Sequence, residues 1–280
     1  NISIAGSAPT VVFTVDTSCA GGTNNFVDLS NPPLGQTIVS RDWEFGDGNT
    51  LNTTNTNISH NYLDTGTFNA KLIITASNGC SEQQTQPVLI SPYPIANFIT
   101  SGNNCFGNDV VFSDSSNSLG HAIVSQSWNF GDPSSGSNNL SVQSSPSHAF
   151  TSFGNFGIQY IIVNQFNCSD TVTNYINIKE SPSANFTNST PCINEVIQFT
   201  DLTTTGTTFL SSHQWDFGDL TGSTLPNPIH TYNTSNNFNV QLIAIANNGC
   251  KDTLTKTLTI YPKPNPSFVN IADVCAEETI

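Results

Sequence analysis

Residues 43 to 50 read WEFGDGNT, and nearly the same phrase returns twice further along the chain. The second copy is WNFGDPSS, beginning at Trp128, and the third is WDFGDLTG, beginning at Trp215. These are the only three Trp residues, and each opens the motif W-x-F-G-D. The copies are 85 residues apart from 43 to 128 and 87 apart from 128 to 215. Such a period indicates a tandem array of similar units.

The sequence that follows each motif predicts β-strands. Each motif is followed by H-x-[YF], beginning at His60, His148 and His230, and then by a stretch in which apolar residues alternate with polar ones. Alternation with a period of two is typical of a strand with one buried face. The turns SNGC and NNGC, with Asn78 and Asn248, indicate hairpins because Asn and Gly tolerate positive φ. No stretch has a helical stripe of useful length, so we predict an all-β fold.

Within the motif, the aromatic residues have an architectural interpretation. Two residues that are two apart in a strand share a face, so the Trp and Phe of each motif are predicted to be core residues: Trp43, Phe45, Trp128, Phe130, Trp215 and Phe217. The Gly then allows a bend that a Cβ would obstruct, and the Asp accepts hydrogen bonds from turn amides. Copies two and three have Pro133 and Leu220 where copy one has Gly48, so their turns are expected to differ.

Composition favours an extracellular protein without nucleic-acid or membrane partners. Only 9% of residues are charged, with 20 acidic against 6 basic residues and a net charge of −14. Phosphate and anionic lipid binding need basic patches, so neither partner is expected. No apolar run is long enough to span a bilayer, and no signal peptide is visible. We therefore predict neither membrane insertion nor a cytosolic location.

The chain has seven Cys residues, and six of them fall at two equivalent positions in each unit. One precedes the second strand and the other follows the penultimate strand. If the first and last hairpins lie at the same end of a sandwich, the two meet, which predicts Cys19–Cys80, Cys105–Cys168 and Cys192–Cys250. Disulfides indicate an oxidising compartment. The alternatives are free buried thiols or zinc, although there is no C-x-x-C pair.

Taken together, the W-x-F-G-D motif, the H-x-[YF] pair and the Phe-led strand resemble the PKD (polycystic kidney disease) domain family over nearly the whole chain. The resemblance implies tandem Ig-like β-sandwiches in an elongated array, most of them without catalytic activity. The predicted boundaries are 1–7 for the tail of a preceding repeat, 8–92, 93–181 and 182–262 for three repeats, and 263–280 for the start of a fourth.

Two aspartates per unit raise the question of chemistry. One belongs to the motif and the other lies nine residues after the first Cys, which gives Asp28, Asp47, Asp114, Asp132, Asp201 and Asp219. No nucleophile elbow, H-E-x-x-H helix, nucleotide loop or EF-hand loop is present. We therefore predict no enzyme, no cofactor and structural aspartates, with calcium as the alternative because some PKD domains bind it. His60, His148 and His230 are interpreted as packed residues that donate to backbone carbonyls.

Two functions remain open at this point. The first is a non-catalytic segment of a large secreted surface protein (an adhesin, stalk or extracellular filament), with neighbouring repeats, other copies, surface glycans or proteins as partners. Such arrays resemble cell-surface proteins of Bacteroidota, including gliding-motility adhesins exported by type IX secretion. The second is a spacer or substrate-binding region of a secreted hydrolase. Short Pro-bearing joints, such as SPYP at 91–94, favour a semi-rigid array.

The two ends of the chain repeat patterns seen inside it. PNPSFVNIADVC, residues 264 to 275, resembles PIANFITSGNNC, residues 94 to 105. We therefore expect Cys275 to open a fourth repeat and to bond with a residue beyond the chain. The first residues resemble the end of an earlier repeat, so the sequence is expected to be a window from a longer array.

Overall fold

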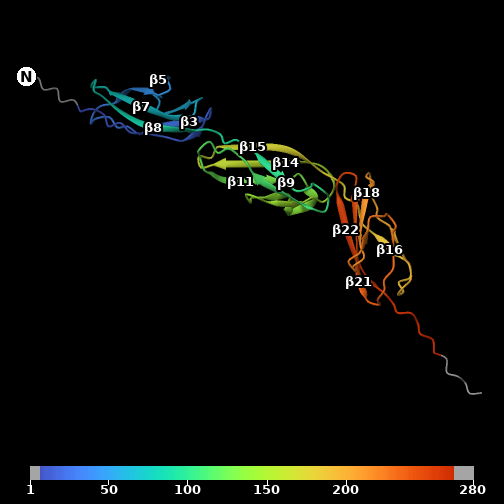
Figure 1. Cartoon of the computed structure of the whole chain (residues 1–280). Coiled ribbons are helices and arrows are strands. Elements are labelled where there is room, and N and C mark those ends of the chain that lie inside the picture. The colour runs from blue at the N-terminus through green and yellow to red at the C-terminus, as the bar shows by residue number, and fades with distance from the viewer. Residues whose placement is uncertain (1–6, 268–280) are drawn as a thin grey trace, which may run out of the picture. The chain divides into compact units, whose positions relative to one another are not determined.

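The computed structural model describes residues 7–267 and confirms an all-β fold. Each repeat forms two facing sheets, and we name them sandwich 1 (residues 13–91), sandwich 2 (98–178) and sandwich 3 (186–259) (Figure 1). Sandwich 1 contains β1 (Phe13–Val15), β2 (Ser18–Cys19), β3 (Thr23–Asp28), β4 (Ile38–Glu44), β5 (Thr50–Thr53), β6 (Asn57–Asn61), β7 (Gly66–Ala76) and β8 (Ser81–Ser91). Its sheets have the orders β1-β3-β6 and β2-β8-β7-β4-β5.

Sandwiches 2 and 3 repeat this plan. Sandwich 2 contains β9 (Phe98–Ser101), β10 (Asp109–Asp114), β11 (Ile123–Asn129), the 3-10 segment η1 (Pro133–Asn139), β12 (Leu140–Ser141), β13 (Ser147–Ala149), β14 (Gly154–Asn164) and β15 (Ser169–Ile178). Sandwich 3 contains β16 (Phe186–Asn188), β17 (Ile197–Asp201), β18 (Leu210–Asp216), β19 (Gly222–Ser223), β20 (Ile229–His230), β21 (Asn237–Ala246) and β22 (Lys251–Thr259). The sheet orders are β13-β10-β9 with β12-β11-β14-β15, and β16-β17-β20 with β19-β18-β21-β22.

By contacts, the chain divides into two compact units, and the division falls inside sandwich 2. One unit contains sandwich 1 together with Asp109–Ala149 and Asn155–Ile176. The other contains Asn103–Asn108, Phe150–Gly154 and the chain from Asn177 onward, and therefore sandwich 3. The loops at one end of sandwich 2 thus pack with sandwich 3 rather than with the rest of their own sandwich.

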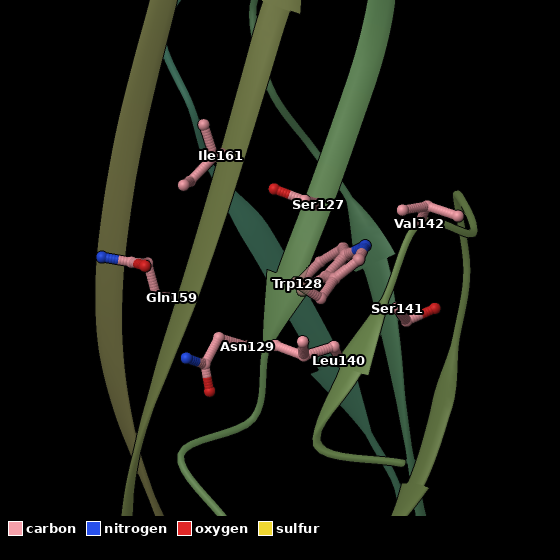
Figure 2. Close-up of a pocket in the computed structure, with 8 residues that line it drawn as sticks. All are labelled: Ser127, Trp128, Asn129, Leu140, Ser141, Val142, Gln159 and Ile161. Carbon is pink, nitrogen blue, oxygen red and sulfur yellow. The ribbon is translucent and has the colours of Figure 1, made fainter. Parts of the chain in front are cut away.

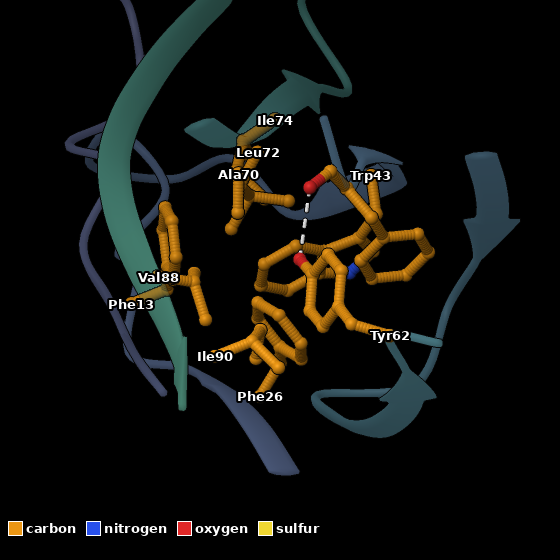
Figure 3. Close-up of a cluster of buried hydrophobic side chains, with 10 residues drawn as sticks. Phe13, Phe26, Trp43, Tyr62, Ala70, Leu72, Ile74, Val88 and Ile90 are labelled. Atoms are coloured by element: carbon orange, nitrogen blue, oxygen red, sulfur yellow. Dashed lines mark hydrogen bonds between the residues drawn. The ribbon is translucent and has the colours of Figure 1, made fainter. Parts of the chain in front are cut away.

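The motif residues lie where the alternation predicts. All six predicted core aromatics are buried between the sheets: Trp43, Phe45, Trp128, Phe130, Trp215 and Phe217. In sandwich 1, the ring of Trp43 meets Phe13 edge-on at a centroid distance of 5.1 Å, and both contact the buried side of β7 and β8 (Figure 3). Aromatic pairs in this geometry contribute about 0.5–1.5 kcal/mol beyond their burial. The core prediction is confirmed.

The long hairpin of each sandwich differs in detail from the predicted turn. Gly79 has φ +80° and Gly249 has φ +86°, whereas Asn78 and Asn248 are not in the left-handed region. Each Asn side chain instead accepts a hydrogen bond from the amide of the following Cys, at 3.0 Å from Cys80 and 2.9 Å from Cys250. The Asn is therefore selected for its side-chain oxygen, and the Gly alone provides the positive φ.

Candidate functional site

The motif aspartate and the motif histidine form one cluster in sandwich 1. Asp47 follows β4 and His60 lies on β6, and the His60 Nε2 is 2.7 Å from the Asp47 Oδ2. The imidazole stacks on Phe45 with ring centroids 3.9 Å apart. Two residues further on, the Tyr62 hydroxyl donates to the Phe45 carbonyl at 2.8 Å (Figure 3). The W-x-F-G-D and H-x-Y motifs thus hold each other across the two sheets.

Sandwich 3 reproduces this cluster closely. The His230 Nε2 lies 2.7 Å from the Asp219 Oδ2, and its ring stacks on Phe217 at 4.3 Å. The Tyr232 hydroxyl donates to the Phe217 carbonyl at 2.8 Å. The partner of each histidine is therefore a carboxylate, so the predicted donation to backbone carbonyls is wrong. The Asp and His recur in every repeat, and that joint recurrence was the signal for the pairing.

In sandwich 2 the cluster is modified. The His148 Nε2 lies 3.2 Å from the Asp132 Oδ2, and its ring stacks on Phe130 at 4.4 Å. Phe150 replaces the tyrosine, so this repeat has no hydroxyl at that position. Pro133 begins the 3-10 segment η1, which confirms the altered turn expected in copy two.

For copy three, the expected change of turn is wrong. Asp219 accepts a hydrogen bond from the Thr221 amide at 3.1 Å, just as Asp47 accepts one from the Asn49 amide at 3.0 Å. The turn is kept because Leu220 adopts φ +72°, a conformation that is rare for residues with a side chain. Leu220 is fully exposed there.

Hydrogen bonds to the motif aspartates change their protonation. Burial acts to raise the pKa of Asp47, but the hydrogen bonds from His60 and Asn49 outweigh it and hold the pKa below its ordinary value of 3.8. The pKa of Asp219 is also lowered, because bonds from Thr221 and His230 outweigh the effect of burial. Burial raises the pKa of the Tyr62 hydroxyl, which keeps it protonated as a donor. These groups are fixed in single hydrogen-bonding roles.

The second aspartate of each unit closes a different turn. The Asp28 Oδ1 accepts from the Ser30 amide at 2.8 Å, and its Oδ2 lies 2.6 Å from the Nε of Arg41. In sandwich 3, the Asp201 Oδ1 accepts from the Thr203 amide at 2.9 Å, and its Oδ2 lies 2.9 Å from the Nε2 of His213. Arg41 and His213 both lie two residues before the motif Trp. The carboxylate therefore joins the turn of one sheet to the central strand of the other.

In sandwich 2 the corresponding position holds no basic residue. Asp114 accepts from the Ser116 amide at 2.8 Å. Gln126 lies two residues before Trp128, and it accepts a hydrogen bond at 3.0 Å from Tyr160. The turn is kept and the ion pair is replaced by neutral groups.

These partners bear on the two chemical hypotheses for the aspartates. Five of the six candidates, all except Asp114, have a His or Arg nitrogen within 3.2 Å. Within residues 7–267, no group of three or more His, Cys, Asp or Glu side chains is arranged to hold a metal ion. Each carboxylate lies in the same structural position in its own repeat, so the geometry assigns the aspartates to turn closure and sheet pairing.

The disulfides do not follow the predicted pairing. Cys19 is bonded to Cys168 with a Cα–Cα distance of 5.7 Å, and Cys105 to Cys250 with 5.6 Å. Each bond therefore links one sandwich to the next. The predictions Cys19–Cys80, Cys105–Cys168 and Cys192–Cys250 are wrong, and Cys275 lies outside the described residues.

Strand length explains the error. Cys19 pairs in register with Ser91, at the last residue of β8, whereas Cys80 precedes the first. Eleven residues of strand extend about 36 Å, so the two Cys positions lie at opposite ends of their sandwich. We call the end at Cys19 the exit end, because the chain leaves there, and the other the hairpin end. The sequence prediction placed both at one end because the two-residue strand β2, which pairs parallel to β8, has no alternation to reveal it.

Hydrogen bonds fix each hairpin end to the chain that precedes its sandwich. The acceptor is always the carbonyl six residues before the Phe of the first strand, and the donor is an Asn amide of the long hairpin. The three pairs are Asn78 to Ser7 at 3.2 Å, Asn164 to Pro92 at 3.2 Å and Asn248 to Glu180 at 2.7 Å. We call the segment between one sandwich and the next the joint. The hairpin thus holds the joint next to the disulfide.

The described surface also has one shallow, mostly apolar depression of about 460 Å³ on sandwich 2. It lies on β11, β12 and β14, and Leu140 and Val142 project along one side of it (Figure 2). Its lining residues are Ser127, Trp128, Asn129, Leu140, Ser141, Val142, Gln159 and Ile161, so it contains no acid, base or metal ligand. In the described part of the chain, no helix has the length and apolar character needed to cross a membrane.

A comparison with known families agrees with this repeated arrangement. The family described as the PKD domain matches residues 6–90 and 179–261. The chain belongs to the PKD domain family. The two matched ranges contain the two repeats with the complete Asp, His and Tyr cluster, and the residues between them contain the modified sandwich 2.

Solved structures with PKD or other β-sandwich domains are similar to parts of the chain. The PKD1 domain of the Vibrio cholerae metalloprotease PrtV is 24% identical, with a TM-score of 0.27, and the match covers 30% of this chain and 99% of that one. The PKD1 domain of Vibrio anguillarum Epp is 22% identical, with a TM-score of 0.28, covering 31% and 95%. A bacterial ice-binding adhesin of 1.5 MDa is 11% identical, with a TM-score of 0.35, covering 92% and 100%.

Proposed function

We propose that this chain is a non-catalytic, load-bearing segment of a large secreted surface protein: an adhesin, stalk or extracellular filament of the kind that Bacteroidota export to the cell surface. One observation carries the proposal: the sandwiches are joined to one another by disulfides, in addition to the backbone. A bond of this kind within a sandwich protects that sandwich, whereas a bond between sandwiches protects the connection. The partners are accordingly neighbouring repeats.

The two bonds give the chain two overlapping covalent routes. From Cys19 to Cys250 the backbone runs over 231 residues (19 to 250), but the route through the Cys19–Cys168 bond runs over only 82 (168 to 250). The route along the backbone to Cys105 and then through Cys105–Cys250 runs over 86 residues (19 to 105). Loss of either bond alone therefore changes the shortest route by only a few residues.

Pulling single molecules from both ends tests this arrangement. The fully stretched length should increase by roughly 520 Å when both disulfides are reduced, because 149 residues are released at about 3.5 Å each. The variants Cys19→Ser and Cys105→Ser should each keep nearly the short length. If either single variant lengthened as much as the reduced chain, the overlapping routes would not exist and the load-bearing proposal would lose its support.

We also propose that folding requires no calcium, because five of the six candidate aspartates already have a cationic or histidine partner. Calcium would have to displace those partners, and their loss would offset the gain from binding. Thermal unfolding of the oxidised chain should give the same midpoint with excess EDTA as with calcium. A clear rise of the midpoint with calcium, absent with magnesium, would contradict the proposal.

A further inference from the structure

Cys192 has the same backbone setting as the two Cys residues that bond to a following sandwich. Cys19 lies opposite Ser91 in a parallel pair, Cys105 opposite Lys179, and Cys192 opposite Tyr261. In each case the amide of the next residue donates to the carbonyl of that opposite residue, at 3.0, 2.8 and 3.0 Å respectively. Cys192 is half-buried. The exit end of sandwich 3 is therefore built like the exit ends of sandwiches 1 and 2.

The joint at this exit end also matches the earlier ones in the sequence. From the last Ile of a sandwich to the first Phe of the next, the distance is eight residues in each occupied joint, from 90 to 98 and from 178 to 186. It is again eight from Ile260 to Phe268. A further sandwich that begins at Phe268 would have its joint carbonyl at Pro262, in the position of Pro92 and Glu180.

We propose that Cys192 is a covalent docking site for the hairpin end of another sandwich of this kind. The occupant is a β-hairpin whose Asn amide donates to the Pro262 carbonyl and whose next strand is preceded by a Cys, as in the hairpins of Cys168 and Cys250. The proposal rests on the proposed function in that the joints are the structural element. It goes beyond it in naming the partner of this residue.

The bond forms by thiol–disulfide exchange with a small-molecule disulfide such as oxidised glutathione. The Cys192 thiolate attacks one sulfur, which gives a mixed disulfide and releases one reduced thiol. The thiolate of the incoming hairpin then displaces the second small thiol. Two protein thiols are oxidised and one disulfide reagent is reduced to two thiols, so electrons and protons balance.

A four-sandwich protein tests the proposal directly. Residues 1–267 are followed by a second copy of residues 186–267, so that the copied Phe186 takes the place of Phe268. The exposed positions Val196 and Lys251 are changed in the copy only, Val196→Ile and Lys251→Arg, to mark its peptides by mass. The protein is folded with oxidised and reduced glutathione, alkylated with N-ethylmaleimide, and digested with trypsin and chymotrypsin without reduction.

The expected result is a linked pair of peptides, with Cys192 of the original sandwich 3 bonded to Cys250 of the copy. The copy's own Cys192 is the matched control, because no sandwich follows it, and it should be alkylated. Changing Cys250→Ser in the copy alone should make the original Cys192 react with maleimide as well. The native Cys19–Cys168 and Cys105–Cys250 bonds in the same digest report correct folding.

Three outcomes would overturn the proposal. The original Cys192 could be alkylated as fully as the control, it could be bonded to Cys80, or it could be bonded to the copy's Cys192. The force measurement on the parent chain uses Cys19, Cys105, Cys168 and Cys250 only. A failed docking test with an intact short stretched length would therefore reject the Cys192 site and leave the load-bearing role standing.

Discussion

At the scale of residues, the motif aspartate serves as the acceptor that orients a histidine. Asp47 takes the Asn49 amide with one oxygen and His60 with the other, while His60 stacks on Phe45. Hydrogen bonds to an ionised carboxylate are stronger than bonds between neutral groups. One short motif thus fixes the turn, the ring stack and the contact between the two sheets.

The lowered pKa of Asp47 and Asp219 predicts acid sensitivity in sandwiches 1 and 3. A carboxyl whose pKa is lower in the folded state contributes stability above its unfolded pKa, near 4. That stability is lost as the pH falls from about 4 through the lower, folded pKa. Urea unfolding followed between pH 5 and 2 should show this loss.

The controls for the acid prediction are Asp47→Asn and Asp219→Asn. Each variant should be less stable than the parent near neutral pH and should lose less of its remaining stability on acidification. An unchanged pH slope in the double variant would show that other carboxyls, and not these two, account for acid sensitivity.

At the scale of elements, the glycine that ends the motif strand allows two chains to approach closely. Gly46 has φ +84°, and a Cβ built there would lie 2.7 Å from the carbonyl oxygen of Asn69 in β7. Gly131 and Gly218 meet β14 and β21 in the same way, at 2.5 and 2.7 Å. The strand therefore bends directly over its neighbour, which a side chain would prevent.

Gly46→Ala and Gly48→Ala form a matched pair that separates this approach from backbone strain. Gly48 also has a positive φ, +94°, but a Cβ there meets nothing within 4 Å. Gly48→Ala should cost about 1–2 kcal/mol of stability from the left-handed backbone alone. Gly46→Ala should cost clearly more, because the Asn69 backbone must also move, and denaturant unfolding measures the difference. Equal costs would remove the close approach as the reason for the glycine.

The elements also show what a sequence can and cannot reveal here. Trp43 and Phe45 were assigned to the core correctly because alternation records which face is buried. Cys19 was paired wrongly because β2 is two residues long and pairs in parallel with the far end of β8. Which end of a sandwich a loop occupies depends on strand length and connection, and neither of these leaves a residue pattern around Cys19.

At the scale of the whole molecule, a bond between sandwiches couples their stabilities. Closing a loop of 149 residues removes conformational entropy worth on the order of 5 kcal/mol at most in the chain-entropy model. Cys19→Ser should therefore weaken sandwiches 1 and 2 together and leave sandwich 3 nearly unchanged. Hydrogen exchange resolved by peptide measures each sandwich separately.

The matched control is Cys105→Ser, which should weaken sandwiches 2 and 3 and spare sandwich 1 because it removes the second bond only. Pairing within each repeat predicts a different pattern, in which each substitution affects a single sandwich. An effect of Cys19→Ser confined to sandwich 1 would therefore argue against the bonds between sandwiches.

The overlap of the two loops has a consequence for a protein exposed to extracellular proteases. The loop from Cys19 to Cys168 and the loop from Cys105 to Cys250 share residues 105–168. After a single peptide bond is cleaved anywhere between Cys19 and Cys250, at least one covalent connection still joins the two ends. Separation requires a second cut, with one before Cys105 and the other after Cys168. A nicked molecule thus stays in one piece, as a cable does after one of its strands has broken.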